Sequence, residues 1–252
     1  MEPAKPAPCQ VLPWDSDFFK ARIARVAGGH MDNARAAAVD AWCLSEHVNC
    51  VYFLTELSDA QAILAAEDHG FRLMDIRETY VLSPGKRLPH PVLPGLTIRA
   101  ALPDDLPALE AIAGYSHRDT RFYSDPHFQR GLCDELYRTW IRRSCGEGFA
   151  DAVLVGDARG QAIGYVSCSL DQEPLRGRIG LVGVAEEWRG SGVGPALVAG
   201  AVGWFRERAA SEVSVVTQGR NVNGQRLYQR CGFLLRAAEA WFHKWYAAGD
   251  RR

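Results

Sequence analysis

The spacing of apolar residues in the first third of the chain predicts helices that alternate with strands. One face of the segment over residues 32–47 is apolar and would pack against a sheet; its residues are Ala36, Val39, Trp42, Cys43 and Leu44. Ser58 or Asp59 can cap the next predicted helix, and Gly70 can end it. The elements predicted here are a helix over residues 32–47, a strand over 50–57, a helix over 59–69 and a strand over 71–82.

The N-terminal stretch has two parts of different character. Residues 1 to about 10 are rich in proline and alanine, and we expect them to be frayed. Trp14, Phe18 and Phe19 form a dense aromatic cluster just after them. We expect this cluster to pack against the first sheet.

A proline-rich segment separates the first part of the chain from the second. Residues 83–95, SPGKRLPHPVLPG, hold four prolines and two glycines, so they cannot continue a helix or a strand. The sequence therefore predicts a domain boundary here, with one domain over residues 1–90 and another over residues 91–252.

The second part of the chain repeats the alternation over a longer stretch. The predicted elements are a strand over residues 96–101, a helix over 104–114, a polar and aromatic loop over 115–126, a helix over 128–145, strands over 152–156, 163–170 and 178–184, a helix to about 210, a strand over 212–218, a helix over 221–229 and a strand over 233–245. Strands that alternate with helices indicate an α/β layer architecture.

The two parts also show a weak internal repeat. When Gly70 is aligned with Gly232, Asp59 falls opposite Asn221, and Ala66 falls opposite Tyr228. The first part looks like a partial copy of the second, but it lacks the glycine loop described next. If the repeat is real, any cofactor chemistry belongs to the second part.

A glycine-rich loop follows the strand that ends near Val184. The stretch RIGLVGVAEEWRGSGVG over residues 178–194 leads from an apolar strand into a helix. Glycines let backbone N–H groups approach a ligand, and the start of a helix presents unpaired donors, so this stretch suits an anion. It lacks the lysine of a nucleoside-triphosphate loop and the spacing of a dinucleotide fingerprint. What remains is R-x-x-G-x-G; the alternative is an ordinary glycine-rich turn.

This loop resembles the acyl-CoA loop of the GCN5-related N-acetyltransferase (GNAT) family. A second stretch, NVNGQRLYQRCGF, matches that family's N-x-x-A-x-x-x-Y-x-x-x-G-F at Asn221, Tyr228, Gly232 and Phe233, with Gly224 in place of alanine. The resemblance covers about residues 96–245. It implies an α/β GNAT fold, in which helices flank a mixed central sheet, preceded by a smaller α/β domain like a partial GNAT.

The resemblance also implies acetyl-CoA as the acetyl donor and a set of residues that hold it. Backbone N–H groups of Val182, Gly183 and Val184 would hold the pantetheine arm and polarise the thioester carbonyl. Tyr228 would give its proton to the departing thiolate, or is a half-buried core residue; Asn221 would cap its helix, touch the cofactor, or both. The residues expected around the diphosphate are Arg189, Gly190, Ser191, Gly192, Val193, Gly194 and Ala196.

Two further segments limit the choice of acceptor substrate. Residues 11–26 and 120–144 resemble the dTDP-fucosamine acetyltransferases, which acetylate an amine on a dTDP-linked aminosugar. Arg118 and Arg121 would pair with a nucleotide diphosphate, and Phe122 or Tyr123 would stack on a base or sugar. The alternative is that these arginines are solvated and the aromatics anchor the loop.

No residue stands out as a general base. The candidates are His117, Asp119, Asp125, His127, Asp171 and Glu173. A sugar amine can also lose its proton to water before it binds. The histidines show no metal-ligand spacing, so we expect catalysis without a metal.

Composition excludes several classes of partner. The 252 residues hold 29 Lys and Arg against 30 Asp and Glu, so no basic field indicates nucleic acid or a membrane surface. Seven scattered cysteines and the lack of a signal-like or membrane-length apolar run predict a soluble cytoplasmic protein, which could be a homodimer. The rival functions are acetylation of another small amine, such as an aminoglycoside-like antibiotic, and acyl-CoA binding without catalysis.

Overall fold

The computed structural model describes residues 7–83, 93–172 and 175–247. Its elements cluster into two compact units that are not contiguous in sequence. The first unit comprises Met1–Arg77, Ser124–Phe128 and Ala238–Arg252, and the second comprises Glu78–Tyr123 and Gln129–Ala237. Most of the predicted boundary segment lies outside the described residues, and the division of the sequence at residue 90 stays a prediction.

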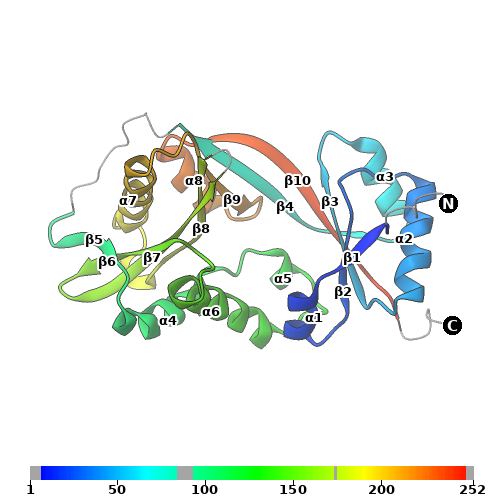
Figure 1. The fold of residues 1–252 in the computed structure, drawn as a ribbon, viewed down its shortest axis with the longest axis horizontal. Helices are drawn as coiled ribbons and strands as arrows, with labels where there is room; N and C mark the ends of the chain where they lie inside the picture. Colours follow the sequence, from blue (N-terminus) through cyan, green and yellow to red (C-terminus); the bar gives the residue numbers. More distant parts are fainter. Residues whose placement is uncertain (1–6, 84–92, 173–174, 248–252) are drawn as a thin grey trace. The chain divides into compact units, whose positions relative to one another are not determined.

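The first unit is a small sheet covered by helices (Figure 1). Strands β2 and β3 run parallel, while β1 and β10 pair antiparallel with β2 and β3 respectively. Its core is built from aromatic and small side chains, among them Phe53, Phe71, Phe242 and Ala66. Its elements are β1 (Cys9–Val11), α1 (Pro13–Phe19), β2 (Ile23–Val26), α2 (Asn33–Ser45), β3 (Cys50–Glu56), α3 (Ala60–Asp68), and parts of β4 (Arg72–Leu82) and β10 (Leu234–Trp245).

The N-terminal stretch is more regular than its composition predicts. The expectation of fraying to about residue 10 is wrong for Cys9–Val11, which pairs with β2 and buries Cys9. The aromatic cluster forms α1, a helix of 7 residues that starts at Pro13. Trp14 and Phe18 stack on each other at 5.0 Å, and Phe19 is the buried member. Pairing across the sheet orders a segment whose own composition favours disorder.

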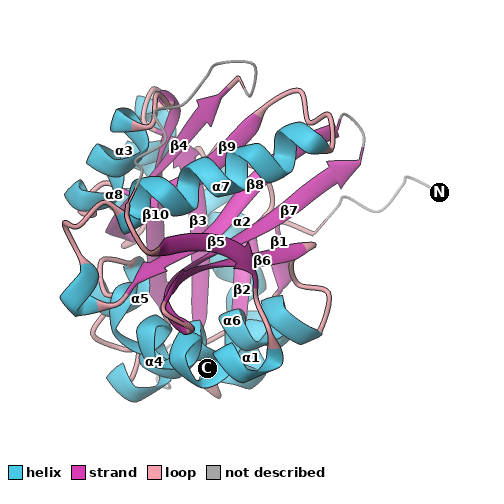
Figure 2. Ribbon diagram, turned by 90° about the vertical axis from the view of Figure 1, so that its left-hand side faces the viewer, coloured by secondary structure: helices cyan, strands magenta, loops and turns pink. Residues whose placement is uncertain are grey.

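The second unit has a mixed sheet with helices on both faces. Strands β5 to β8 pair antiparallel in sequence order, and β9 pairs parallel with β8. Helix α7 packs on one face, and α4 and α6 pack on the other (Figures 1 and 2). Its elements are β5 (Leu96–Ala100), η1 (Pro103–Asp105), α4 (Leu106–Ser116), α5 (Arg121–Ser124, with Ser124 in the first unit), α6 (Arg130–Gly146), β6 (Ala152–Ala158), β7 (Gln161–Gln172), β8 (Leu175–Val184), η2 (Glu186–Trp188), α7 (Val193–Glu207), β9 (Val213–Gln218), α8 (Val222–Arg230), and parts of β4 and β10.

The predicted strands and long helices of this unit are confirmed, but the loop over residues 115–126 is partly helical. Helix α4 continues to Ser116, and the short helix α5 begins at Arg121. Thr120 starts that turn, since its carbonyl accepts a hydrogen bond from the amide of Tyr123. Phe122 is buried, so this segment packs through an aromatic side chain rather than lying open.

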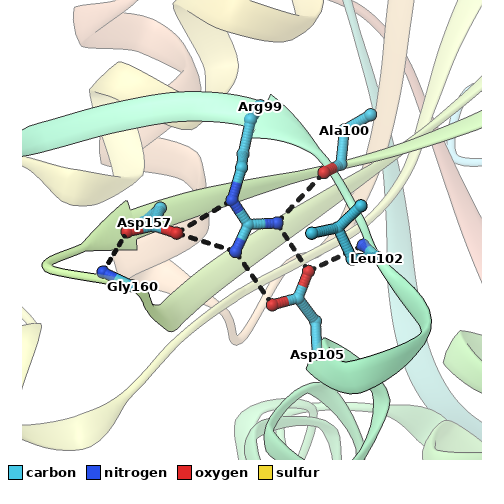
Figure 3. Close-up of polar contacts among 6 residues, drawn as sticks. All are labelled: Arg99, Ala100, Leu102, Asp105, Asp157 and Gly160. Atoms are coloured by element: carbon cyan, nitrogen blue, oxygen red, sulfur yellow. Dashed lines mark hydrogen bonds and ion pairs between the residues drawn. The ribbon is translucent and has the colours of Figure 1, made fainter.

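An ion-pair network fixes one end of the second unit's sheet (Figure 3). The guanidinium of Arg99 on β5 donates to Asp157 at 2.8 Å and to both oxygens of Asp105 at 2.7 and 3.0 Å. Asp105 also accepts from the amide of Leu102, and Asp157 accepts from that of Gly160. The network therefore ties β5, the turn before α4 and the β6–β7 hairpin together.

The internal repeat has a structural counterpart. Strands β2 and β3 pair in parallel at three residue positions, and β8 and β9 also pair in parallel at three residue positions. The helix after each pair is capped in the same way, because Asp59 accepts from the amide of Ala62, and Asn221 from that of Gly224. Each unit thus contains the same strand, helix, strand and capped-helix sequence.

Candidate functional site

Strands β8 and β9 lie side by side only at their start. Their parallel pairing covers Gly177–Ile179 of β8 and Val213–Val215 of β9, yet β8 continues to Val184 and β9 to Gln218. On its other edge, β8 shifts register against β7 between Val166 and Cys168. One edge of β8 near its end therefore has no neighbouring strand among the described pairs, and its backbone groups there can bind a ligand.

A cavity of about 790 Å³ opens at this gap, wholly within the second unit. Its wall combines the end of β8, the glycine loop, the start and one face of α8, and the end of α4 with the residues after it. The lining residues are Tyr115, Ser116, Arg118, Asp119, Val182, Gly183, Val184, Glu186, Trp188, Arg189, Gly190, Gly192, Gly194, Pro195, Asn221, Asn223, Gly224, Arg226, Leu227, Tyr228 and Arg230.

The glycine loop places the N-terminus of α7 at this cavity. Gly190 and Gly192 have φ values of +77° and +98°, which residues with side chains rarely adopt, and Gly192 is the N-cap of α7. A Cβ on Gly190 would meet nothing within 4 Å, so this glycine faces open space. The first helical turn holds backbone N–H groups without intrahelical partners, and such groups suit a phosphate.

Most residues predicted to hold the cofactor lie around the cavity. The cavity is lined by Val182, Gly183, Val184, Arg189, Gly190, Gly192, Gly194, Asn221 and Tyr228. Val193 and Ala196 point elsewhere, since both are buried in the core beneath α7. Ser191 is not in the lining, and its hydroxyl donates to the carbonyl of Trp188 at 2.6 Å.

Gly183 is needed because an aromatic ring lies against it. A Cβ at this position would come within 2.7 Å of the Tyr165 ring. The Tyr165 hydroxyl lies 2.9 Å from Nε2 of His117, the residue that ends α4. Burial lowers the pKa of His117 to about 4, with a smaller contribution from Arg189, so His117 is neutral at physiological pH. This hydrogen bond ties the end of α4 to the strand beneath Gly183.

Tyr228 lines the cavity although only 6% of its surface is exposed. Its ring neighbours those of Tyr80 and Phe233, at 6.3 and 6.0 Å. Burial raises the pKa of Tyr228 well above the usual value, with a smaller contribution from Cys231. The phenol therefore stays protonated at neutral pH and can act as a proton donor.

Asn221 holds the start of α8 through both ends of its amide. Its oxygen accepts from the amide of Gly224 at 2.9 Å, and its nitrogen donates to the Thr217 hydroxyl at 3.1 Å. A Cβ on Gly224 would lie 2.6 Å from that amide nitrogen. Glycine in place of the family's alanine therefore leaves space for the Asn221 side chain.

The four residues predicted to bind the acceptor separate into two groups. Arg118 lines the cavity, next to Asp119. Arg121, Phe122 and Tyr123 do not line it. The guanidinium of Arg121 lies 4.2 Å above the buried ring of Phe122, and the hydroxyl of Tyr123 donates to Asp134.

Of the candidate bases that the structure describes, Asp119 lines the cavity, and His117, Asp125, His127 and Asp171 do not. Asp125 and His127 belong to the first unit, and Glu173 lies outside the described residues. Burial on its own raises the pKa of Asp125, but hydrogen bonds from His243, Trp245 and His127 outweigh burial and hold it far below the usual value. Asp125 is therefore a buried structural carboxylate. Asp171 is exposed on β7.

Several lining residues were not predicted from the sequence. On α8 these are Asn223, Arg226, Leu227 and Arg230. They recur at spacings of three and four residues, so they lie along one side of the helix. Once Asn221 and Tyr228 had placed α8 at the site, this periodicity was the signal that could have identified them. Glu186 and Trp188, from the turn before the glycine loop, had no comparable signal.

Within residues 7–83, 93–172 and 175–247, no group of three or more His, Cys, Asp or Glu side chains is arranged to hold a metal ion. Across the same ranges, no helix has the length and apolar character needed to cross a membrane.

Comparison with known proteins gives one family and a set of similar folds. Residues 115–233 match the model of the acetyltransferase (GNAT) family. The spore coat polysaccharide biosynthesis protein SpsD of Bacillus subtilis (strain 168) is 28% identical over 144 residues, which span 57% of this chain and 48% of that protein. The match thus spans about half the length of this curated relative.

Solved structures resemble the fold over nearly the whole chain. A GCN5-related N-acetyltransferase from Sphaerobacter thermophilus has a TM-score of 0.63 at 19% identity, covering 94% of this chain and 76% of its own. A GCN5-related N-acetyltransferase from Kribbella flavida has a TM-score of 0.64 at 17% identity, covering 98% and 90%. The chain therefore shares the fold of these acetyltransferases, and residues 115–233, just under half of its length, match the acetyltransferase (GNAT) family model.

Proposed function

We propose that the second unit binds acetyl-CoA in the cavity and transfers its acetyl group to the amine of a nucleotide-linked aminosugar, with dTDP as the expected nucleotide. The observation that carries this proposal is that one cavity brings together the free end of β8, the glycine loop and Tyr228. In this proposal the end of β8 binds the pantetheine arm, the glycine loop binds the diphosphate, and Tyr228 is the acid.

The residues present fit the coenzyme. Val182, Gly183 and Val184, at the end of β8 that does not pair with β9, would hold the pantetheine arm through their backbone groups. The amides from Gly190 to Gly194 take the diphosphate, because the open side of Gly190 admits a ligand at the start of α7. Arg189 adds a positive charge beside them; its guanidinium lies 5.3 Å from the Tyr115 ring centroid.

Acetyl-CoA, when bound, supplies an acyl group on a thioester. The acceptor nitrogen forms a bond to the acyl carbon, the carbon–sulfur bond breaks, and the sulfur leaves with its electron pair. Backbone N–H groups at the end of β8 stabilise the negative charge that develops on the carbonyl oxygen. Tyr228 donates its proton to the sulfur, and water takes the proton lost by the amine.

The position of Arg118 is an argument for an anionic acceptor. Arg118 lines the cavity on the side formed by the end of α4, two residues before the segment 120–144 that resembles aminosugar acetyltransferases. A guanidinium pairs well with a nucleotide diphosphate. The name of the Bacillus subtilis relative, a polysaccharide biosynthesis protein, is consistent with an acceptor from carbohydrate metabolism.

The test is a thiol-release assay with acetyl-CoA and a panel of amines. The panel contains dTDP- and UDP-linked aminosugars, the free aminosugars and aminoglycosides, and mass spectrometry identifies the acetylated product. We expect turnover with a nucleotide-linked aminosugar and at least about tenfold lower kcat/KM without the nucleotide, the loss of one charged contact. If the enzyme prefers an aminoglycoside, the proposed acceptor is wrong. If it binds acetyl-CoA but turns over no amine, a non-catalytic role is favoured.

A further inference from the structure

One side of α8 places positively charged residues at the cavity. These residues are far in sequence from the glycine loop. Asn223, Arg226 and Arg230 all line the cavity and recur at helical spacing. Residues four apart on a helix have their Cβ atoms about 6 Å from each other, so the two guanidinium groups can converge on one ligand group. Neither arginine is one of the motif residues of this segment, which are Asn221, Tyr228, Gly232 and Phe233.

The charge of the cavity differs from that of the chain. The chain as a whole is nearly neutral, with a formal net charge of −1. The charged lining of the cavity consists of four arginines, Arg118, Arg189, Arg226 and Arg230, and two carboxylates, Asp119 and Glu186. Among the described residues, neither Arg226 nor Arg230 has a carboxylate within ion-pair distance. The cavity is thus locally positive and suits an anion with more charge than a single diphosphate.

We propose that Arg226 and Arg230 form a second phosphate-binding site in this cavity, separate from the glycine loop. The inference rests on the proposed function, which supplies two possible sources of the phosphate. Coenzyme A carries a phosphate monoester on its ribose in addition to its diphosphate. A nucleotide-linked acceptor carries a diphosphate of its own. In both cases a guanidinium binds phosphate oxygens through paired N–H donors.

A purely structural role explains one of the two arginines at most. Arg230 lies in the last turn of α8, where a positive charge stabilises the helix dipole. Arg226 lies in the middle of the helix and is exposed. Arg226 is therefore the more informative position, and its replacement should change ligand binding with little effect on folding.

The experiment measures binding by calorimetry to the full chain, wild type and the variants Arg226→Gln and Arg230→Gln. The ligands are acetyl-CoA, dephospho-acetyl-CoA, adenosine 3′,5′-bisphosphate and dTDP. The control variant is Arg208→Gln, which removes a positive charge from the same unit. Arg208 does not line the cavity, and its guanidinium lies 3.9 Å from the Trp204 ring centroid.

If the site holds the coenzyme's ribose phosphate, both variants weaken acetyl-CoA and adenosine 3′,5′-bisphosphate by about tenfold or more and leave dephospho-acetyl-CoA unchanged. If it holds the acceptor, both variants weaken dTDP by a similar factor and spare the other ligands. Either pattern supports the site and identifies its source. Equal affinity of both variants and wild type for all four ligands, or losses matched by Arg208→Gln, would overturn it.

The failure of the proposed function looks different. In that case the wild-type chain fails to bind acetyl-CoA, or binds it without turnover on any amine, whatever happens at α8. Adenosine 3′,5′-bisphosphate and dTDP still report on Arg226 and Arg230, because neither ligand carries an acyl group or needs turnover. The two hypotheses are therefore tested by different measurements on the same samples.

Discussion

At the scale of single residues, the site depends on side chains whose burial decides their chemistry. Tyr228 is held among rings and kept neutral, while His117 is neutral because burial lowers its pKa to about 4. Arg226 and Arg230 are exposed along one side of α8. Tyr228 and the two arginines thus line one cavity, while the neutral His117 side chain lies outside its lining and hydrogen bonds to Tyr165 beneath Gly183.

Replacement of Tyr228 tests its role as the acid. Tyr228→Phe should lower kcat by about 10² to 10³, because the leaving sulfur loses its proton donor, and should change the Kd of acetyl-CoA by less than about twofold. Steady-state kinetics and calorimetry measure the two effects. Tyr80→Phe is the matched control, because Tyr80 is a buried neighbour of Tyr228 that does not line the cavity. An unchanged rate in Tyr228→Phe would remove Tyr228 as the acid.

Gly224 gives a second test, in which helix propensity and local geometry predict opposite results. Alanine should stabilise a helix by about 1 kcal/mol over glycine. Here its Cβ would lie 2.6 Å from the Asn221 side chain and would displace a cap that contributes about 1 kcal/mol. We expect no gain from Gly224→Ala in the wild type and a gain of about 1 kcal/mol in an Asn221→Ala background. Urea unfolding of the four variants measures this, and an equal gain in both backgrounds would contradict it.

At the scale of elements, the separation of β8 from β9 creates the site. Parallel pairing ends at Ile179, and the remaining residues of β8 present their free edge to the cavity. Gly183 keeps this part of the strand close to Tyr165, and the glycine loop then turns the chain into α7. The position of a backbone edge, rather than of any one side chain, determines where the arm of the coenzyme would lie.

Two glycine replacements separate packing from backbone strain. Gly183→Ala should cost about 1–3 kcal/mol, because the new Cβ overlaps the Tyr165 ring and disturbs its bond to His117. Gly190→Ala should cost only about 1 kcal/mol, because its φ of +77° is strained for alanine but the space is open. Chemical unfolding measures both. Gly183→Ala should recover part of its loss when combined with Tyr165→Leu, and no recovery would argue against the overlap.

At the scale of the whole molecule, the complete cavity belongs to one unit, and the network around Arg99 holds that unit's sheet. The hydrogen bond from Arg99 to Asp105, together with a backbone bond, lowers the pKa of Asp105. A lowered pKa means that this carboxylate stabilises the fold when it is ionised. The contribution is present above the ordinary aspartate pKa of about 3.9 and is lost as the pH falls through the folded value.

Arg99→Met should therefore destabilise the protein by about 2 kcal/mol at pH 7 and by less at pH 3. The cost is below that of a fully buried pair because 29% of the Arg99 side chain is exposed. Arg142→Met is the control, since its pair with Glu110 is more exposed, at 44% for Arg142, and should contribute less than about 1 kcal/mol. Thermal unfolding at both pH values measures these effects, and an Arg99→Met loss that does not depend on pH would contradict the assignment.

The sequence predicted the order of the long strands and helices, because hydrophobic periodicity is local and each of these elements covers at least two turns or several strand residues. It missed β1 and α1, whose order comes from pairing with β2 and from Phe19 in the core. It left open whether Phe122 contacts the acceptor or anchors its loop, and the structure buries this ring beside Cys133, whose thiol donates to the Phe122 carbonyl. Such contacts join residues that periodicity treats as unrelated.

By itself, the sequence determined the glycine loop and the capped helix that bears Tyr228, because both are encoded by short runs of residues with specific backbone requirements. Only the tertiary structure decided which side chains share the cavity. Arg118 lines the cavity, whereas Arg121 does not. Val193 and Ala196 are buried in the core, and Arg226 and Arg230 line the cavity wall. The physical reason is that backbone conformation is set largely by neighbours in sequence, whereas the composition of a cavity is set by how sheets and helices pack.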